Sequence, residues 1–479
     1  AVASSDDGDR GGEHDGGTDP ETAQPYATPT ITYATFVGRG VDAGKRALTF
    51  RDNAGGNYSN SVFFNYARGV DVEDLSEGED SYSRFLSGDL TFTNNVVDCG
   101  SNAFVTSQGE DLSEYFNANG NSTSSDHGLT WSPSAVSLAG RADWASWTLA
   151  MTSGWVSPGE AVQGDVVVSS NVTGTAYWTA NNTYHLDGGV FVEPGATLHI
   201  EAGTVVKGMP GQGAESSYLC VAKGAQIFAE GTADAPIIFT FEADPLDGST
   251  PLTTRGQWGG LIVLGEAGLN STPGVSSIEG IPTNVPFGQY GGDNDADNSG
   301  VITYVSIRHG GTEIGAGNEI NGFTLGGVGS GTTINNVEVI ANADDGIEFF
   351  GGTVSIQNAM VAGVGDDSYD YDEGWRGQLN SNWVAVASSD DGDRGGEHDG
   401  GTDPETAQPY ATPTITYATF VGRGVDAGKR ALTFRDNAGG NYSNSVFFNY
   451  ARGVDVEDLS EGEDSYSRFL SGDLTFTNN

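Results

Sequence analysis

The chain has 479 residues, and its 65 acidic side chains outnumber 20 basic ones, which gives a formal net charge of −45 at pH 7. So much negative charge argues strongly against nucleic acid and anionic membrane surfaces as partners. It favours cations, calcium above all, because calcium takes carboxylate and carbonyl oxygens as ligands, whereas the simpler alternative is that the charge only keeps the surface soluble.

Glycine accounts for 72 residues, and Val, Ile, Thr, Phe and Tyr recur in short runs bounded by Gly, Asn and Asp. This composition predicts strands and tight turns rather than helices. No apolar run approaches the about 20 residues that a membrane-spanning helix needs, so we expect no membrane span.

The beginning of the chain is repeated at its other end. Residues 1–95 recur without a substitution as residues 385–479. Tandem repeats ordinarily diverge, so a perfect copy indicates a recent duplication, an engineered concatenation, or a repeating polymer of which this chain spans one unit and part of the next. All three explanations are compatible with the sequence.

Short alternating strands follow along the chain. Residues 189–208, "GVFVEPGATLHIEAGTVVKG", place Val190, Val192 and Leu198 at inward positions between glycine-containing corners. Residues 224–244 repeat the same pattern. Strict alternation over a few residues predicts half-buried strands.

Acidic turns give the clearest period. Asp344-Asp345, Asp366-Asp367 and Asp390-Asp391 lie 22 and 24 residues apart. A period in the low twenties, made of strands and tight turns, predicts the stacked coils of a parallel β-helix, because a single coil buries its face only against its neighbours. A β-sandwich, the alternative, would show longer strands linked by hairpins.

Several long motifs occur in a fixed order, among them "VFVEPGATLHIEAGTVVKG", "GAQIFAEGTADAPIIFT", "RGQWGGLIVLGEA" and "GDDSYDYDEGWRG". Over residues 182–479 they resemble a family of secreted bacterial β-helix surface proteins, mostly without an assigned activity. The resemblance implies an all-β fold, a right-handed parallel β-helix (solenoid) with irregular polar loops and a short tail segment. It also implies an extracellular or cell-surface location, and it supplies no reaction.

The same resemblance divides the chain. Residues 140–155, "GRADWASWTLAMTSGW", resemble the closing segment of such a protein, and residues 164–198 resemble an opening. We therefore expect residues 1–95 to form the C-terminal coils of one β-helix unit and residues 96–156 its tail. Residues 157–479 would form the N-terminal and central coils of the next unit.

One acidic turn has the spacing of a cation site. Residues 291–300, "GGDNDADNSG", place Asp293, Asp295 and Asp297 at alternate positions, as in the first part of an EF-hand loop. Tyr304 stands at the twelfth position, where an EF-hand has its bidentate Glu, and no helices are predicted beside the loop. The sequence leaves a calcium-binding turn or a solvated acidic loop.

A larger set of carboxylates should stack on adjacent coils. Carboxylates one strand spacing apart, about 4.8 Å, repel one another unless protons, basic residues or a metal lie between them, and Arg376 and Arg394 can neutralise only part of the charge. We therefore predict calcium ligands rather than a solvated acidic face. The predicted ligands are Asp344, Asp345, Glu348, Asp366, Asp367, Asp370, Asp372, Glu373, Asp390, Asp391, Asp393, Glu397 and Asp399.

The same groups admit a catalytic alternative, because acidic β-helix enzymes cleave glycosidic bonds with paired carboxylates or bind uronate through calcium. Tyr369, Tyr371 and Trp375 would then stack on sugar rings, or else they cap corners of the solenoid. No motif identifies a nucleophile or a base. We predict no catalytic residue, and a polysaccharide-binding or polysaccharide-cleaving protein is the alternative function.

The end of one unit runs directly into the beginning of the next, and a head-to-tail contact that does not close generates a fibre. We therefore expect a structural subunit of an extracellular filament or surface fibre, built from copies of itself and stabilised by calcium, in adhesion or matrix. Cys99 in the tail of one unit and Cys220 in the opening coils of the next would form a disulfide across the junction or stay free thiols.

Overall fold

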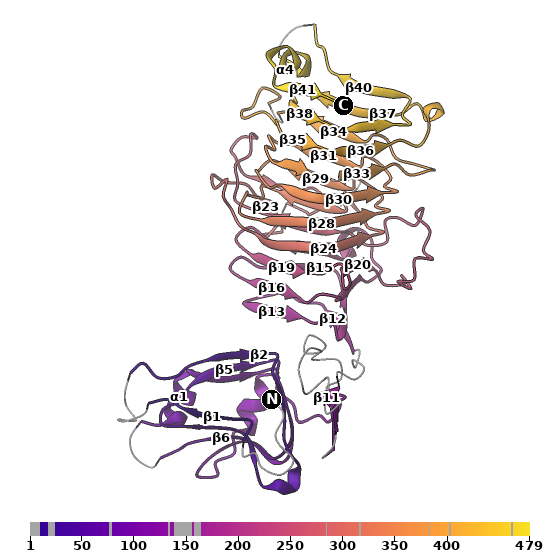
Figure 1. The fold of residues 1–479 in the computed structure, drawn as a ribbon. Helices are drawn as coiled ribbons and strands as arrows, with labels where there is room; N and C mark the ends of the chain where they lie inside the picture. Colours follow the sequence, from indigo (N-terminus) through magenta and orange to yellow (C-terminus); the bar gives the residue numbers. More distant parts are fainter. Residues whose placement is uncertain are drawn as a thin grey trace. The chain divides into compact units, whose positions relative to one another are not determined.

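The structure is a computed structural model, and contacts divide the chain into two compact units, Ala1–Val162 and Gln163–Asn479, called the first and second unit below (Figure 1). This division lies close to the predicted boundary between residues 156 and 157. The expected closing segment, residues 140–155, lies outside the described residues. The described residues are 10–17, 24–75, 79–132, 135–137, 156–157, 164–283, 285–315, 318–381, 383–401, 404–460 and 463–479.

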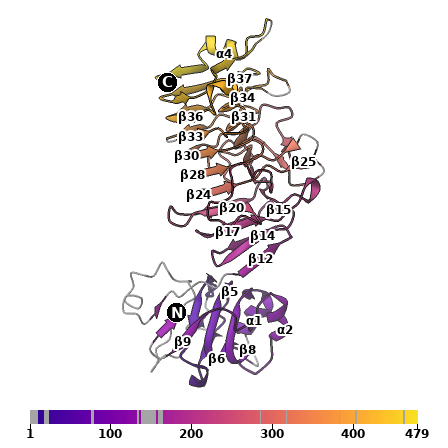
Figure 2. The same cartoon turned by 90° about the vertical axis from the view of Figure 1, so that its right-hand side faces the viewer.

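The second unit is a stack of coils, seen from two sides in Figures 1 and 2. Its larger sheet has 17 strands, and each pairs in parallel with strands of neighbouring coils. The strands are β12 (Gly164–Val168), β13 (Thr175–Trp178), β14 (Asn182–Leu186), β16 (Thr197–Ile200), β17 (Val205–Gly208), β19 (Gln226–Glu230), β20 (Ile237–Phe241), β24 (Gly300–Arg308), β28 (Thr333–Ile340), β30 (Ile356–Ala362), β32 (Gln378–Asn380), β33 (Trp383–Val386), β35 (Thr414–Thr416), β36 (Ala418–Val421), β38 (Gly440–Ser443), β39 (Val446–Phe448) and β41 (Leu474–Thr477).

A second parallel sheet of nine strands runs along the same stack. Its strands are β15 (Gly189–Val192), β18 (Tyr218–Val221), β21 (Leu261–Leu264), β27 (Phe323–Gly326), β29 (Ile347–Phe350), β31 (Tyr369–Asp372), β34 (Gly396–Asp399), β37 (Arg430–Arg435) and β40 (Arg452–Val456). Short elements lie in the loops: β22 (Ser276–Ser277), β23 (Gln289–Tyr290), β25 (Glu313–Gly315), β26 (Asn318–Glu319), helix α4 (Ser465–Ser471) and the 3₁₀ turns η3 (Gly213–Glu215) and η4 (Val425–Ala427).

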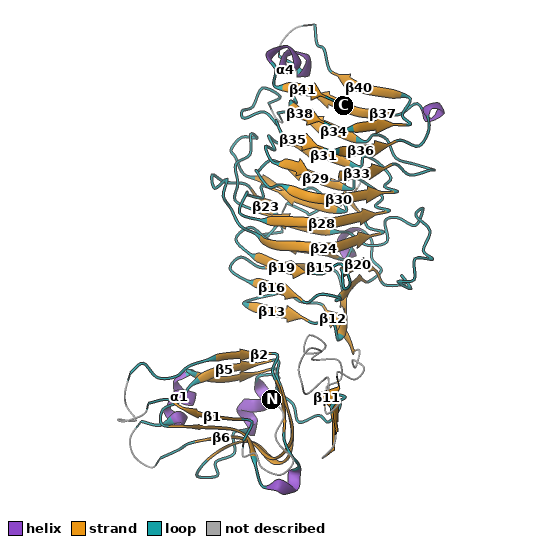
Figure 3. Cartoon of the chain, in the orientation of Figure 1, coloured by secondary structure: helices purple, strands orange, loops and turns teal. Residues whose placement is uncertain are grey.

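The first unit repeats the end of this stack. One sheet joins β1 (Gly12–Asp15), β4 (Arg46–Arg51), β6 (Val62–Val72), β3 (Thr35–Val37) and β8 (Val96–Thr106), and another joins β2 (Thr30–Thr32), β5 (Gly56–Ser59) and β7 (Leu90–Thr93). Figure 3 shows the few short helices beside these strands. The other elements are η1 (Val41–Ala43), α1 (Ser81–Ser87), α2 (Ser113–Ala118), β9 (Thr130–Ser132), β10 (Ala135–Ser137) and β11 (Val156–Ser157).

The core is a set of apolar columns that run through the coils. In the nine-stranded sheet, Val190, Leu219, Leu261 and Phe323 stand at paired positions on consecutive strands. All four are fully buried. Each coil thus buries its inward face against the next one, which is the arrangement that the coil-length period predicted. The parallel β-helix is confirmed.

Bends in the long strands follow from local chemistry. Tyr304, Asn336 and Asn358 each have a positive φ, of 50°, 53° and 57°, inside β24, β28 and β30. Asn adopts this left-handed conformation more readily than most residues. Because the bends fall at equivalent places, successive coils turn together and the sheet stays paired on both sides of each bend.

A long loop between β21 and β24 covers part of the outer face of the nine-stranded sheet. Phe191, Cys220 and Ile262 point outward from consecutive strands and pack in one apolar cluster with residues of this loop, including Ile278 and Tyr290. Beyond Ile262 the same outward column continues with Thr324 and then with Glu348.

Candidate metal centre

Three carboxylates continue the outward column of the nine-stranded sheet. Glu348 of β29 pairs with Asp370 of β31, and Asp370 pairs with Glu397 of β34. In-register neighbours in a parallel sheet project their side chains to the same face, about 4.8 Å apart. The strand register therefore places three acidic groups next to one another on consecutive coils.

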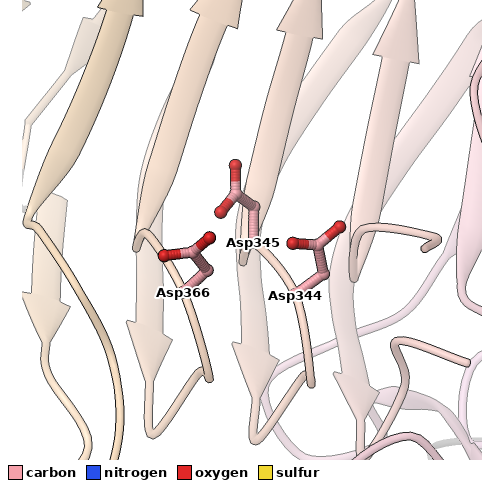
Figure 4. A group of neighbouring side chains, drawn as sticks. All are labelled: Asp344, Asp345 and Asp366. Carbon is pink, nitrogen blue, oxygen red and sulfur yellow. The ribbon is translucent and has the colours of Figure 1, made fainter. Parts of the chain in front are cut away.

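The turns before these strands add further carboxylates. Figure 4 shows Asp344 and Asp345 on one turn and Asp366 on the next. One carboxylate oxygen from each of these three residues lies within 4.8 Å of the others. Asp367 connects the two turns, since its backbone N–H donates to Oδ1 of Asp345 at 2.8 Å.

Two more groups of three carboxylates have oxygens within 4.8 Å of one another, and each shares a member with the first group. One group consists of Asp345, Glu348 and Asp370, and the other of Asp366, Asp367 and Asp393. The three groups thus form one continuous run of acids, called the acidic run below, across three coils. It contains Asp344, Asp345, Glu348, Asp366, Asp367, Asp370 and Asp393.

Burial makes the middle of the acidic run electrostatically costly. Asp345 is 8% exposed and Glu348 is 7% exposed. Burial, followed by the negative charge of neighbouring carboxylates, raises the pKa of both groups well above the ordinary value. Asp370 is half-buried as a residue, yet its carboxyl group is enclosed, and the same two causes raise its pKa.

Basic side chains neutralise Asp367 and Asp393 in the acidic run. Arg394 lies 3.0 Å from Asp367 and 3.2 Å from Asp393, and Lys429 lies 3.0 Å from Asp393. Burial raises the pKa of Asp367, while Arg394 opposes that rise. Within the described part of the chain, no ion pair joins a basic side chain to Asp345, Glu348 or Asp370.

The carboxylates of the acidic run could hold a divalent cation such as calcium. Calcium takes six to eight oxygen ligands, from carboxylates, carbonyls and water, in flexible geometry. Asp345 belongs to two groups at once, so a cation there would bind side chains from neighbouring coils. Such an ion would hold the coils together and remove the repulsion that their register imposes.

Comparison with known proteins bears on the fold that carries these groups. The family model of a pectate-lyase-like β-helix domain matches residues 1–149 and 170–479. The chain belongs to this family. No curated protein and no solved structure matches it. The family match thus identifies the β-helix that carries the acidic run. What the acidic run can bind follows from its own geometry.

The structure does not bring every predicted ligand of this β-helix into the acidic run. Asp390 pairs with Arg255 at 2.8 Å, and Asp391 lies 4.0 Å from the same side chain. The hydrogen bond from Arg255 lowers the pKa of Asp390 to about 2. Arg255 comes from a distant loop, so the spacing of the acidic turns did not reveal that it neutralises the third one.

The turn at residues 291–300 is not a convergent site either. Asp293 and Asp295 are exposed, and Asp295 pairs with Arg376 at 3.1 Å. Asp297 is buried and accepts a hydrogen bond from Ser299 at 3.1 Å. Among the described residues, none of these aspartates belongs to a group of three possible ligands.

The remaining predicted ligands have structural partners. Glu373 accepts a hydrogen bond from Tyr290 at 2.7 Å and so ties the covering loop to the coils. Asp399 and Glu397 both pair with Arg435, at 2.6 and 2.8 Å. Asp372 stands two residues after Asp370 on the same strand and is half-buried.

Two neighbours of Glu348 were missed by the sequence interpretation. The Asn321 side chain donates hydrogen bonds to Glu348 and, at 2.9 Å, to Glu279. Asn321 is 1% exposed. Both partners come from loops without a period or motif, so nothing in the sequence singled them out.

The aromatic residues beside the acids belong to the core of the β-helix. Tyr369, Tyr371 and Trp375 are fully buried. Tyr371 stacks on His398 with ring centroids 4.1 Å apart. These rings therefore pack inside the solenoid, and the possibility that they stack on sugar rings at the surface is wrong.

Both cysteines are free thiols in the structure. Cys220 is fully buried under the covering loop, and burial raises the pKa of its thiol. A thiol in this state is a poor nucleophile. The disulfide between Cys99 and Cys220 stays a prediction, and it would require Cys220 to become exposed.

Proposed function

We propose that this pectate-lyase-like β-helix is a structural subunit of an extracellular filament or surface fibre, assembled head to tail and stabilised by calcium, in adhesion or matrix. The observation that carries the proposal is the acidic run. Its central carboxylates, Asp345, Glu348 and Asp370, lie within 4.8 Å of one another and have no basic partner among the described residues. A structural subunit needs coils that stay stacked along the solenoid axis. Ions that bind carboxylates from neighbouring coils would stabilise this stacking.

Without a bound cation the acidic run destabilises the folded chain. Near neutral pH its buried carboxyl groups either keep protons that solution would remove or bear unneutralised charge, and both states cost stability. A bound calcium ion removes that cost and adds its own binding free energy to the folded state. Stability of the β-helix would thus depend on calcium concentration.

The perfect repeat supports the assembly part of the proposal. Residues 1–95 and 385–479 have one sequence, and both form coils of the same kind, with β4 and β37, for example, over equivalent residues. Coils that occur twice with one sequence are suited to stacking on the coils of another copy.

The test combines thermal unfolding with electron microscopy of the same sample. We expect calcium to raise the melting temperature relative to a chelator, magnesium to do so less, and filaments with a regular axial repeat to be visible in calcium. An unchanged melting temperature on chelation would contradict the calcium part, and dispersed particles at every calcium concentration would contradict the filament part.

A second candidate function, polysaccharide binding or cleavage, has its own supporting observation. A groove of about 320 Å³ lies on the outer face of the 17-stranded sheet, with Tyr304, Val337, Ala359 and Met360 in its lining. Tyr304 is 37% exposed and Met360 is 43% exposed. Exposed aromatic and apolar surface on an elongated solenoid is suited to sugar rings.

Binding isotherms with acidic and neutral polysaccharides test this candidate. We expect Tyr304→Ala to weaken binding at least tenfold while leaving the melting temperature unchanged. Turnover of any polysaccharide that is lost in Asp370→Asn would instead support a catalytic role. If no polysaccharide of the panel binds, the second candidate function is contradicted and the structural function remains.

A further inference from the structure

Neutral polar side chains form two columns on the outer face of the 17-stranded sheet. The strands that carry them are β24, β28, β30, β32, β35, β38 and β41, which pair in parallel on consecutive coils (Figure 1). One column contains Thr303, Asn335, Gln357, Asn380, Thr416, Ser443 and Thr477, and the other contains Thr333, Ser355, Gln378, Thr414, Asn441 and Thr475. We call these residues the polar array.

The residue between the two columns points into the core on each coil. Ile334, Ile356, Leu379, Ile415 and Tyr442 are at most 3% exposed, whereas every residue of the polar array is half-buried or exposed. Successive residues of a strand point to opposite faces of the sheet. The polar array therefore stands on a packed apolar layer and is itself open to solvent.

Strand geometry gives the polar array two regular spacings. Neighbours within a column lie one strand spacing apart, about 4.8 Å, and the two columns lie two residues apart on each strand, about 6.6 Å. Side-chain hydrogen bonds fix this order in both directions. Thr475 donates to Oδ1 of Asn441 at 2.8 Å within a column, and Asn380 donates to Oε1 of Gln378 at 2.7 Å between the columns. The donors and acceptors thus form a lattice.

Charge and size restrict what this lattice can bind. None of its residues is charged or aromatic, although the chain has 65 acidic and 20 basic side chains, so it offers neither ion pairs nor rings for stacking on sugars. Six strand spacings of length and two columns of width cover about 200 Å². A stable protein–protein interface buries about 800 Å² on each partner. The fitting ligand is uncharged, flat and periodic.

We propose that the polar array binds the surface of ice. Within a plane of an ice crystal, water molecules repeat at a few ångströms in two directions, and each of them both donates and accepts hydrogen bonds. Hydroxyl and amide groups also do both, so the polar array can replace lattice waters at the crystal surface. Its side chains are already ordered, which lowers the entropy cost of binding, and contacts repeated along one rigid scaffold add to one another.

This activity goes beyond the proposed structural function and does not depend on it. The polar array belongs to the 17-stranded sheet, whereas Glu348 and Asp370 of the acidic run belong to the nine-stranded sheet. The first unit carries a shorter version of the same lattice, in register on β2, β5 and β7. It consists of Thr30, Thr32, Asn57, Ser59, Thr91 and Thr93.

The experiment uses the full chain with the lattice interrupted in both units. The array variant combines Thr32→Lys with Thr416→Lys, at identical positions of the two units. The matched control combines Thr173→Lys with Thr253→Lys, since both residues are exposed in loops and the charge changes equally. Circular dichroism and melting temperature verify that each variant folds. If the array variant does not fold, Asn57→Lys with Asn441→Lys, at exposed positions, replaces it.

Slow growth of ice from a protein solution measures the binding, because a growing crystal excludes solutes that do not adhere to it. We expect the unchanged chain and the control to enter the ice, and the array variant to be depleted from it at least fivefold. The gap between the melting and freezing temperatures of a single ice crystal should shrink in parallel. An unchanged chain that stays in the liquid, or a folded array variant that enters the ice equally well, would overturn the proposal.

Two further measurements identify the other occupants of this face. If the chain stays out of ice but sediments with insoluble cellulose, and the array variant does not, the polar array binds a neutral polysaccharide and the ice proposal is wrong. If it stays out of ice and the array variant loses self-association in sedimentation velocity, the face joins copies of the chain and the ice proposal is again wrong. Entry into ice by a chain whose melting temperature ignores calcium supports ice binding and contradicts only the calcium proposal.

Discussion

Replacing Asp345 with asparagine should change stability in opposite directions with and without calcium. Asp345 is 8% exposed, and burial and the charges of Asp367, Asp344 and Asp366 raise its pKa well above 3.8. A carboxyl group with a raised folded pKa contributes stability below its unfolded pKa and loses it as the pH rises through the folded value. Without calcium at pH 7, Asp345 therefore destabilises the protein.

The magnitude follows from the cost of burying a polar group that lacks compensation, which is about 1–3 kcal/mol. Asp345→Asn removes the negative charge and should stabilise the calcium-free protein by an amount of this order. The amide oxygen can still accept the hydrogen bond from the backbone N–H of Asp367, so the turn is preserved.

In calcium the sign reverses. Asp345 belongs to two of the three carboxylate groups, so its loss removes a ligand from both. Calcium at about 100 times its dissociation constant stabilises the folded state by about 2.7 kcal/mol, and the variant should lose much of this. Free energies of unfolding from denaturant titrations, in calcium and in chelator, give the two differences directly.

Asp390→Asn is the control, because Asp390 pairs with Arg255 outside the acidic run. It should change stability by the same small amount in both conditions. If Asp345→Asn destabilises the protein in chelator as much as it does in calcium, the carboxylate stabilises the fold without any ion, and the predicted electrostatic cost is refuted.

Three further measurements test the same electrostatic picture. In chelator, stability should fall as the pH rises above about 4, because the pKa values of Asp345, Glu348 and Asp370 are raised, and calcium should flatten this slope in a pH series of denaturant titrations. Arg394→Ala leaves Asp367 buried without its partner and should lower the free energy of unfolding by about 3–5 kcal/mol. Calcium should restore part of this loss in the same titrations. Equal losses in calcium and in chelator would contradict metal binding beside Asp367. Tyr442→Phe removes buried hydrogen bonds to His398 at 2.8 Å and to Tyr369 at 2.9 Å, and it should lower the free energy of unfolding by about 1–3 kcal/mol. The matched control is Tyr58→Phe, at the identical position of the first unit, where His14 is only half-buried, and it should lower that free energy less. Equal losses would show that burial of the hydrogen bond does not set its contribution to stability.

The pH dependence has an acid limb as well. Burial lowers the pKa of His398 well below 6.5, so the neutral ring contributes stability that is present above about 6.5 and lost as the pH falls below it. His398→Phe should remove this limb in a pH series of melting curves while leaving the calcium-dependent limb unchanged. A variant that keeps the full acid limb would assign it to another group.

Much of the fold was predictable, because a solenoid is built from local repeats. The spacing of Asp344, Asp366 and Asp390 reports the length of a coil, and coil length decides which strands pair. The register then follows from the alternation of inward and outward residues. The same spacing correctly brought Asp345 and Asp366 together on neighbouring turns.

The candidate site was predictable only where its members lie on regular coils. Arg255 pairs with Asp390 across 135 residues of sequence, and Arg376 pairs with Asp295 across 81 residues. The covering loop likewise brings Glu279 to Asn321 beside Glu348. Contacts made by irregular loops leave no period in the sequence, so these partners became visible only in the structure.

The sequence by itself determined the coil, its acidic turns and its excess of negative charge, since these are properties of neighbouring residues and of composition. Only the tertiary structure decided which acids are buried together without a basic partner among the described residues. Burial depends on what packs from elsewhere in the chain. For this reason identical residues such as Val70 and Val454 are buried in one unit and exposed in the other.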